Sequence, residues 1–289
     1  RGDRGDCTSL LCALLHSVHS RSAVTSVTRS RSVDASFARR LALGDRAAAR
    51  NELRRHRDPA TMRWQQAQPC GRARKPCEGH TVSVVDRCLY VLFGKHEDDV
   101  GNVTCPALLM LDTETMMLSH PHFETSGADG RSGIPDDREG HSASVIGTKI
   151  YVFGGTWTDE DDNTIYMNDL HVLDVSNFSW ARPVWSGTPP IEREGHTASV
   201  VGRRVFVFAG TWVDDEHNSV YLNDLHVLDT SVDAMAWTQP STSGEAPCQR
   251  EGHTASTIGD KIVIFGGAGL DKADAQARAI LGAQFRAQF

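Results

Sequence analysis

The chain has 289 residues, of which 39% are hydrophobic, 23% are charged and 7% are aromatic. This length allows one large domain or two ordinary ones, and the composition excludes a disordered chain, a collagen, a coiled coil and a small disulfide-stapled scaffold. The net charge of −7 argues against a nucleic-acid partner, because affinity for phosphate comes mainly from lysine and arginine. No stretch approaches the ~20 apolar residues of a membrane-spanning helix, so no membrane span is predicted.

The charge is divided unevenly along the chain. Residues 1–61 contain twelve Arg against six acidic residues, a balance of +6 that leaves −13 for residues 62–289. The division coincides with Met62, the first methionine. A basic leader that is rich in Arg, Ser and Ala and poor in acids resembles an organelle transit peptide. A disordered tail and a stretch that is not natively translated are the alternatives for residues 1–61.

The triplet Glu-Gly-His recurs at residues 78–80, 139–141, 194–196 and 251–253, which indicates internal repeats. Arg precedes the last three copies, and Cys77 stands in that place in the first. The second and third copies align without a gap from residues 139–174 to residues 194–229, and 22 of the 36 positions are identical. The repeated residues are Arg138, Glu139, Gly140, His141, Gly154, Gly155, Trp180, Arg193, Glu194, Gly195, His196, Gly210, Trp237, Arg250, Glu251, Gly252, His253, Gly266 and Gly267.

Each copy contains four short runs of strand-forming residues, separated by turn residues and with no helical pattern between them. The clearest runs are Ile150–Phe153 and Asn168–Asp174, which return as Val205–Phe208 and Asn223–Asp229. A four-stranded sheet cannot bury both faces alone, so successive sheets must pack against one another. Radial packing into a β-propeller achieves this and leaves only short edges.

The apolar run with a double glycine, the Asn-Asp-Leu-His-Val-Leu-Asp strand and the later Trp resemble the kelch repeat over about residues 76–269. The resemblance implies an all-β kelch-type propeller in residues 62–269, with about three and a half four-stranded blades that begin near residues 78, 139, 194 and 251. Because propellers close with about four to eight blades, we expect an incomplete ring and a fragment. The first repeat is degenerate, with Phe93-Gly94-Lys95 in place of the double glycine. Residues 270–289 have the composition of a helical or disordered tail.

The repeated glycines and charged residues have structural interpretations. Gly154-Gly155 is expected at a sharp turn where a strand ends, because glycine tolerates positive φ and close backbone approach. The Glu-Gly-His triplets contain metal-ligand residue types, but copies placed around a channel would lie too far apart to share one ion. We predict instead that Arg193, Glu194 and His196 make hydrogen bonds and salt bridges between blades. The repeated tryptophans are expected to pack between blades as large apolar side chains.

A partner-binding surface is predicted on one face of the propeller. Trp157 and Trp212 directly follow the glycine turn and open acidic loops, and His96–Asp99 takes the corresponding place in the first repeat. Aromatic side chains rimmed by negative charge suit a basic segment of a protein partner. Solvated loops with a packed Trp, or calcium binding, are the alternatives. The proposed partner-binding residues are Trp157, Asp159, Glu160, Asp161, Asp162, Trp212, Asp214, Asp215 and Glu216.

Kelch propellers occur mostly as protein-interaction modules and less often as enzymes, including the copper enzyme galactose oxidase. The sequence has no nucleophile elbow, Ser-His-Asp signature or zinc-type cysteine pair, so no catalytic residue, metal or cofactor is assigned. A protein-interaction module is predicted, and the alternative is a metalloenzyme or specifier-type protein whose catalytic residues lie outside this fragment. Seven cysteines without repeat spacing indicate reduced thiols and a cytoplasmic location, with organelle import if residues 1–61 are a transit peptide.

Overall fold

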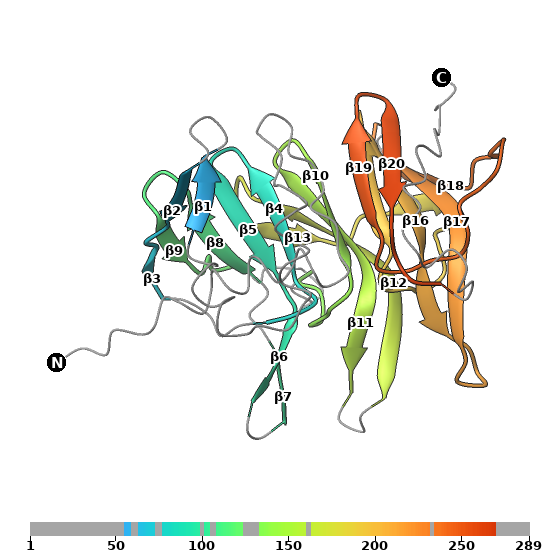
Figure 1. Ribbon diagram of the computed structural model, residues 1–289, viewed down its shortest axis with the longest axis horizontal. Helices are drawn as coiled ribbons and strands as arrows, with labels where there is room; N and C mark the ends of the chain where they lie inside the picture. The colour runs from blue at the N-terminus through green and yellow to red at the C-terminus, as the bar shows by residue number, and fades with distance from the viewer. Residues whose placement is uncertain are drawn as a thin grey trace.

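A computed structural model of the chain describes residues 55–58, 63–72, 77–98, 101–104, 108–123, 133–159, 163–231 and 234–269. In these ranges every regular element is a strand, so the fold is all-β. Three blades and a half-blade follow one another along the chain (Figure 1). Neighbouring blades meet through their innermost strands, which are β4 (Thr81–Val85), β10 (Ser142–Ile146), β15 (Thr197–Val201) and β19 (Thr254–Ile258). The fold is an incomplete propeller, and the predicted fold class is confirmed.

Each full blade is an antiparallel four-stranded meander. Blade one consists of β4, β5 (Cys88–Leu92), β8 (Leu108–Asp112) and β9 (Met117–Ser119). Blade two consists of β10, β11 (Lys149–Thr158), β12 (Thr164–Asp174) and β13 (Ser179–Ala181). Blade three consists of β15, β16 (Arg204–Val213), β17 (Ser219–Asp229) and β18 (Met235–Thr238). The half-blade consists of β19 and β20 (Lys261–Phe265).

Several short strands lie outside these meanders. β3 (Cys70–Gly71) pairs in parallel with β9, and β14 (Trp185–Gly187) pairs in parallel with β18, so blades one and three have a fifth, outermost strand. β6 (Lys95–Asp98) and β7 (Gly101–Thr104) form a hairpin below blade one. β1 (Arg55–Asp58) pairs with β2 (Arg63–Gln66) across the domain boundary placed at residue 61. The predicted tail of residues 270–289 lies outside the described residues, as does most of the predicted leader.

The hydrophobic core lies between blades because each sheet must bury both of its faces. Phe93 of blade one packs against Trp180 of blade two, with ring centroids 5.9 Å apart, within a cluster drawn from both blades. Phe153 of blade two packs in the same way against Trp237 of blade three at 5.2 Å. A third cluster joins blade three to Ile264 of the half-blade. Each interface therefore depends on side chains from two consecutive repeats.

The double glycine does not end a strand, which corrects the prediction. β11 continues through Gly154 and Gly155 to Thr158, and its pairing with β12 shifts register between Phe153 and Gly155, as in a β-bulge. Gly155 has a φ of 98°, and a Cβ added to it would lie 2.5 Å from the carbonyl oxygen of Glu139. The glycines thus let the strand bend past the triplet of its own blade. As a result, the second and third strands of blades two and three are longer than the short runs predicted.

Candidate functional site

The Glu-Gly-His triplets link neighbouring blades through the backbone. The amide of each triplet glycine donates to the carbonyl of the glycine in the preceding triplet, with N···O distances of 3.1, 3.1 and 2.9 Å for Gly140 to Gly79, Gly195 to Gly140 and Gly252 to Gly195. Gly140 has a φ of 63°, and a Cβ there would lie 2.6 Å from the Glu194 carboxylate. The positive φ favours glycine, and a Cβ would also displace the Glu194 side chain.

The histidines of the last three triplets also contact the preceding blade. Burial, reinforced by a neighbouring arginine, lowers the pKa of His196 and of His253 to about 3. These imidazoles are neutral at physiological pH and act as hydrogen-bonding links between blades. The Nε2 atom lies 2.8 Å from a hydroxyl of the preceding blade in the three pairs His141–Thr81, His196–Ser142 and His253–Thr197.

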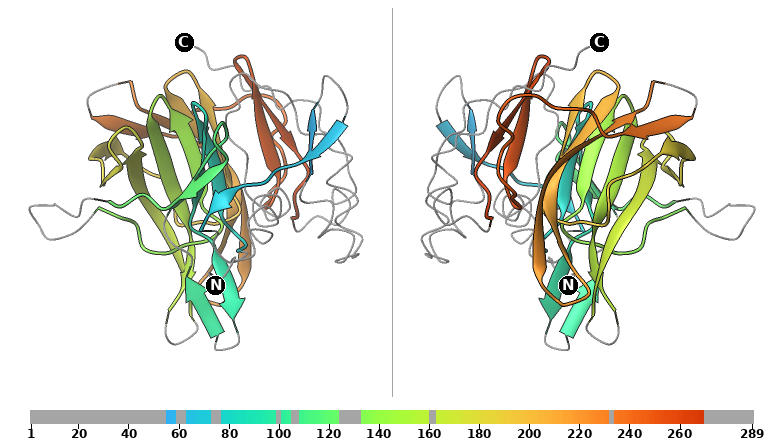
Figure 2. Two further views of the ribbon diagram at one scale, coloured as in Figure 1. Left: turned by 90° about the vertical axis from the view of Figure 1, so that its left-hand side faces the viewer. Right: turned by 90° about the vertical axis from the view of Figure 1, so that its right-hand side faces the viewer.

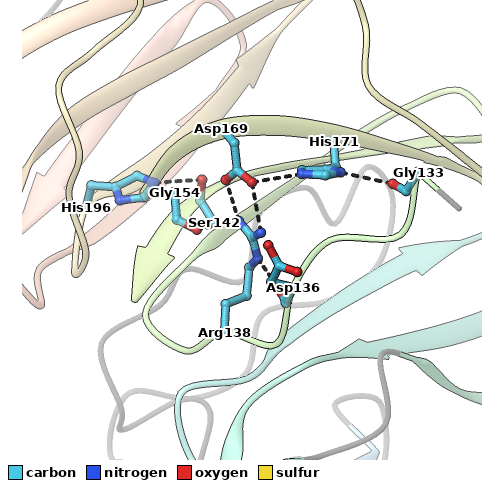
Figure 3. A network of polar contacts seen from close by, with 8 residues as sticks. All are labelled: Gly133, Asp136, Arg138, Ser142, Gly154, Asp169, His171 and His196. Carbon is cyan, nitrogen blue, oxygen red and sulfur yellow. Dashed lines mark hydrogen bonds and ion pairs between the residues drawn. The ribbon is translucent and has the colours of Figure 1, made fainter. Parts of the chain in front are cut away.

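A buried arginine binds the third strand of its own blade, as Figure 3 shows for blade two. Arg138 donates to both carboxylate oxygens of Asp169, at 2.6 and 3.0 Å, and to the carbonyl oxygen of Gly154 at 3.0 Å. His171 completes the network, with Nε2 at 2.8 Å from Asp169 and Nδ1 at 3.0 Å from the carbonyl oxygen of Gly133. The network ties the chain that enters the blade to β12.

Blade three repeats the network. Arg193 donates to the two oxygens of Asp224 at 2.7 and 2.8 Å and to the carbonyl oxygen of Ala209 at 2.9 Å, and His226 lies 3.0 Å from the same carboxylate. The side chain of Arg193 therefore bonds within its own blade, which corrects the prediction of an interblade salt bridge. The backbone of Arg193 does bridge the two blades, because its amide donates to the carbonyl oxygen of Met167 in blade two.

Burial disfavours ionisation of Asp169 and Asp224, but hydrogen bonds from the neighbouring histidine and arginine outweigh it and hold the pKa of both carboxyls well below the usual range. Both are therefore carboxylates at neutral pH. These aspartates and their histidine neighbours were not among the predicted site residues. Their signal was present in the repeated Asn-Asp-Leu-His segment, which we interpreted only as a strand.

The first repeat lacks all three members of this network. Cys77 stands at the position of the arginine, and the aspartate and histidine positions hold Ala107 and Leu109. Cys77 and Leu109 are buried. All three positions of the first repeat hold apolar or small residues, so none of the three charged or polar members is left without its partners.

Trp157 and Trp212 lie within strands and not at the start of loops, which corrects their predicted position. Trp157 of β11 pairs with Ile165 of β12, and Trp212 of β16 pairs with Val220 of β17. Trp157 and Ile165 are each 39% exposed, whereas Trp212 is half-buried. The hairpin of blade two thus carries an exposed apolar pair next to its tip.

The hairpin loops of blades two and three are closed by the same aspartate–asparagine contacts. Asp159 accepts from the amide of Asn163 at 2.8 Å, and Asp214 accepts from the amide of Asn218 at 2.8 Å. These two carboxylates therefore shape the loops. Of the other acidic residues assigned to partner binding, Asp215 and Glu216 are exposed, and Glu160, Asp161 and Asp162 lie outside the described residues.

The three hairpins project from one end of the molecule. β6–β7, β11–β12 and β16–β17 all extend toward the lower end in Figure 1, and the side views in Figure 2 show the same direction. At their bases, side chains join each hairpin to the triplet of the next blade: Lys95 of β6 forms an ion pair with Glu139 at 2.5 Å, and the Thr156 hydroxyl of β11 donates to Glu194 at 3.3 Å. The hairpins thus form one surface, which we call the hairpin face.

In the described part of the chain, no group of three or more His, Cys, Asp or Glu side chains is placed to hold a metal ion. The same part contains no helix long and apolar enough to cross a membrane.

Comparison with known proteins identifies relatives of the repeat region. Residues 43–267 match the family model described as the KLHDC2/KLHL20/DRC7 Kelch-repeats domain. Kelch domain-containing protein 3 of Bos taurus is 30% identical over 220 residues, which cover 72% of this chain and 53% of that protein. Host cell factor 1 of Homo sapiens is 39% identical over 141 residues, which cover 46% of this chain and 7% of that protein. The chain spans about half or less of the length of these relatives.

A solved structure supports the fold independently. The structure of YjhT matches with a TM-score of 0.54 at 17% sequence identity, covering 72% of this chain and 63% of that one. The family match begins within the predicted leader, at residue 43, and covers well over half of the chain. Taken with the blades, the bulged second strands and the interblade triplets, this match shows that the chain belongs to the kelch-repeat β-propeller family.

Proposed function

We propose that the protein is an interaction module that binds a basic segment of a protein partner on the hairpin face, in the cytoplasm. The observation that carries the proposal is the exposed pair Trp157–Ile165 at the tip of the β11–β12 hairpin. A large apolar pair held on a strand is a rigid anchor for a partner side chain, and anchors of this kind provide most of the binding energy in protein interfaces.

The charge around this pair supports a basic partner. Exposed Asp215 and Glu216 lie at the tip of the neighbouring β16–β17 hairpin, and the residues between Asp159 and Asn163 are all acidic. Complementary charge accelerates association and helps to select the partner. Membership of the kelch family and the match to Host cell factor 1 support a protein-interaction role in general.

A selection of random dodecapeptides displayed on phage, with the 289-residue chain as target, tests the proposal. We expect the enriched peptides to carry several Lys or Arg around one large apolar residue, and we expect Trp157→Ala to abolish their binding. Arg182→Ala, an exposed change directly after the outermost strand β13, is the control and should leave binding unchanged. Enriched peptides without excess positive charge, or peptides that bind the Trp157→Ala variant equally well, would contradict the proposal.

A further inference from the structure

One position at the base of each hairpin differs between the three full blades. Its backbone pairs with the triplet glutamate of the same blade, in the bridges Glu78–Lys95, Glu139–Thr156 and Glu194–Thr211. The residue is therefore Lys in blade one and Thr in blades two and three. Because the backbone position is the same, the repeats can be compared with one another at this point.

Blade one shows what the triplet glutamate of the next blade binds. The ammonium nitrogen of Lys95 lies 2.5 Å from a carboxylate oxygen of Glu139 in blade two. Burial lowers the pKa of Lys95, but the bond to Glu139 and the negative charges of Glu139, Glu78 and Glu194 outweigh burial and raise this pKa above its ordinary value. The triplet glutamates of three consecutive blades thus act together on one ammonium group.

The junction between blades two and three has the same carboxylate but a different neighbour. The hydroxyl of Thr156 donates to Glu194 at 3.3 Å, so blade two supplies a neutral hydrogen bond where blade one supplies a positive charge. A carboxylate has two oxygens and can accept about four hydrogen bonds. Glu194 can therefore bind a cationic donor together with the Thr156 hydroxyl.

Glu194 is the triplet glutamate that a partner can best reach. Glu139 is already bound to Lys95, and Glu251 is only 5% exposed, whereas Glu194 is half-buried. Thr156 and Trp157 are consecutive residues of β11, so their side chains lie on opposite faces of the hairpin. A segment that lies across this hairpin therefore meets the apolar anchor on one face and the carboxylate on the other.

We infer that Glu194 is the subsite for one Lys or Arg side chain of the basic partner segment. This inference rests on the proposed function and adds to it the residue that recognises the positive charge. The partner's cationic group lies against Glu194 as the Lys95 ammonium lies against Glu139, and the Thr156 hydroxyl holds the carboxylate in place. Lys95 compensates Glu139, and this directs the basic segment toward blades two and three.

Fluorescence anisotropy of the dodecapeptide most enriched in the phage selection, titrated with the 289-residue chain, tests the inference. Glu194→Gln should weaken binding about tenfold, because a charge-assisted hydrogen bond is lost while the bond from Thr156 is kept. Asp86→Asn, the same change of charge at the exposed β4–β5 turn, is the control and should leave the affinity unchanged. Equal affinity of the parent and Glu194→Gln would overturn the inference.

A second variant makes blade two resemble blade one. Thr156→Lys places a tethered ammonium against Glu194, so peptide binding should again weaken about tenfold, and adding Glu194→Gln should have no further effect. Thr158→Lys adds the same charge to β11 nearer the tip, and in this background Glu194→Gln should keep its full effect. Additive losses in the double variant Thr156→Lys, Glu194→Gln would contradict a shared subsite.

Substitutions in the peptide keep the inference testable if Thr156→Lys does not fold. Each Lys or Arg of the peptide is replaced in turn by Met. One replacement should weaken binding to the parent about tenfold and have no effect on binding to Glu194→Gln, which is the signature of a direct contact. If no replacement behaves in this way, the inference is wrong.

Failure of the inference and failure of the proposed function give different results. A selection that enriches no basic peptide would contradict the proposed function and the inference with it. A basic peptide that requires Trp157 but binds Glu194→Gln as tightly as the parent would contradict the inference alone.

Discussion

At the scale of single residues, the buried arginine–aspartate–histidine networks tie the segment that enters blade two or blade three to the third strand of the same blade. Arg193 is fully buried, and its two bonds to Asp224 compensate the cost of burying its charge. Removing one partner of such a pair leaves an uncompensated charge, whereas replacing every member by apolar residues is often neutral. Blade one, with Cys77 and Leu109 at two of the three positions, is the natural example of full replacement.

We therefore predict that Asp224→Ala lowers the free energy of unfolding by about 3 kcal/mol. The triple variant Arg193→Met, Asp224→Ala, His226→Leu should be more stable than the single variant, because no buried charge remains. Urea unfolding of the three proteins measures both effects. Additive losses, with the triple variant the least stable, would show that the network does not act as a unit.

The neutral histidines predict how stability depends on pH. The pKa of His196 falls from an ordinary value of 6.5 to about 3 in the folded protein. Between these values the unfolded chain binds a proton that the folded chain does not, so the free energy of unfolding falls as pH falls, by about 1.4 kcal/mol per pH unit for each such histidine. Urea unfolding between pH 6.5 and 4.5 should show this slope.

His196→Gln keeps a hydrogen-bonding group near Ser142 but removes the titrating imidazole. The free energy of unfolding of this variant should therefore change less steeply with pH, by about 1.4 kcal/mol per pH unit, which is the contribution of one proton. His122→Gln, a change at an exposed histidine, should leave the slope unchanged. Identical slopes in the parent and His196→Gln would mean that His196 is protonated in the folded state.

At the scale of the strand, the β-bulges fix the path of the second strand in blades two and three. Gly210 has a φ of 103°, and a Cβ there would lie 2.6 Å from the Glu194 carbonyl oxygen. Gly210→Ala should therefore cost about 2–3 kcal/mol through backbone strain and steric conflict. Gly202→Ala, at a turn with φ of 62° and no atom within 4 Å of the added Cβ, should cost about 1 kcal/mol. Equal losses in thermal unfolding would contradict this explanation.

The strands show which local features the sequence could reveal. Alternation and apolar runs predicted the existence of β11 and β16, because burial between blades demands apolar residues. Their length was not predictable, because Gly154-Gly155 and Ala209-Gly210 are compatible with a turn as well as with a bulge. The parallel strands β3 and β14 have two or three residues each and no periodic pattern. Their pairing with β9 and β18 is therefore visible only in three dimensions.

The hairpin tips lead to a kinetic prediction. Asp215→Asn with Glu216→Gln should slow association with a basic peptide from the phage selection severalfold at low salt, and this difference should shrink in high salt. Asp86→Asn with Asp260→Asn removes two negative charges from exposed turns at the opposite ends of their blades and should have little effect. Stopped-flow fluorescence measures the rates. Equal slowing by both pairs would indicate a general charge effect and not a local one.

At the scale of the whole molecule, repetition made the architecture predictable and left the interactions between distant positions hidden. Four Glu-Gly-His triplets revealed the repeats, and the strand-forming runs within each repeat predicted a propeller. Asp169 and Asp224 lie on the third strand of their blades, 31 residues after Arg138 and Arg193, and no local pattern joins the two positions. The exposure of Trp157 could not be predicted either, because it depends on how far the hairpin extends beyond the blade.

Hydrogen–deuterium exchange of the chain with and without a selected basic peptide tests the proposed function most directly. We expect the peptide to slow exchange at the tips of β11–β12 and β16–β17, where Trp157 and Glu216 lie, and to leave the β10–β11 and β15–β16 turns unchanged. Slower exchange confined to those turns, or to the edge of β20, would contradict binding on the hairpin face.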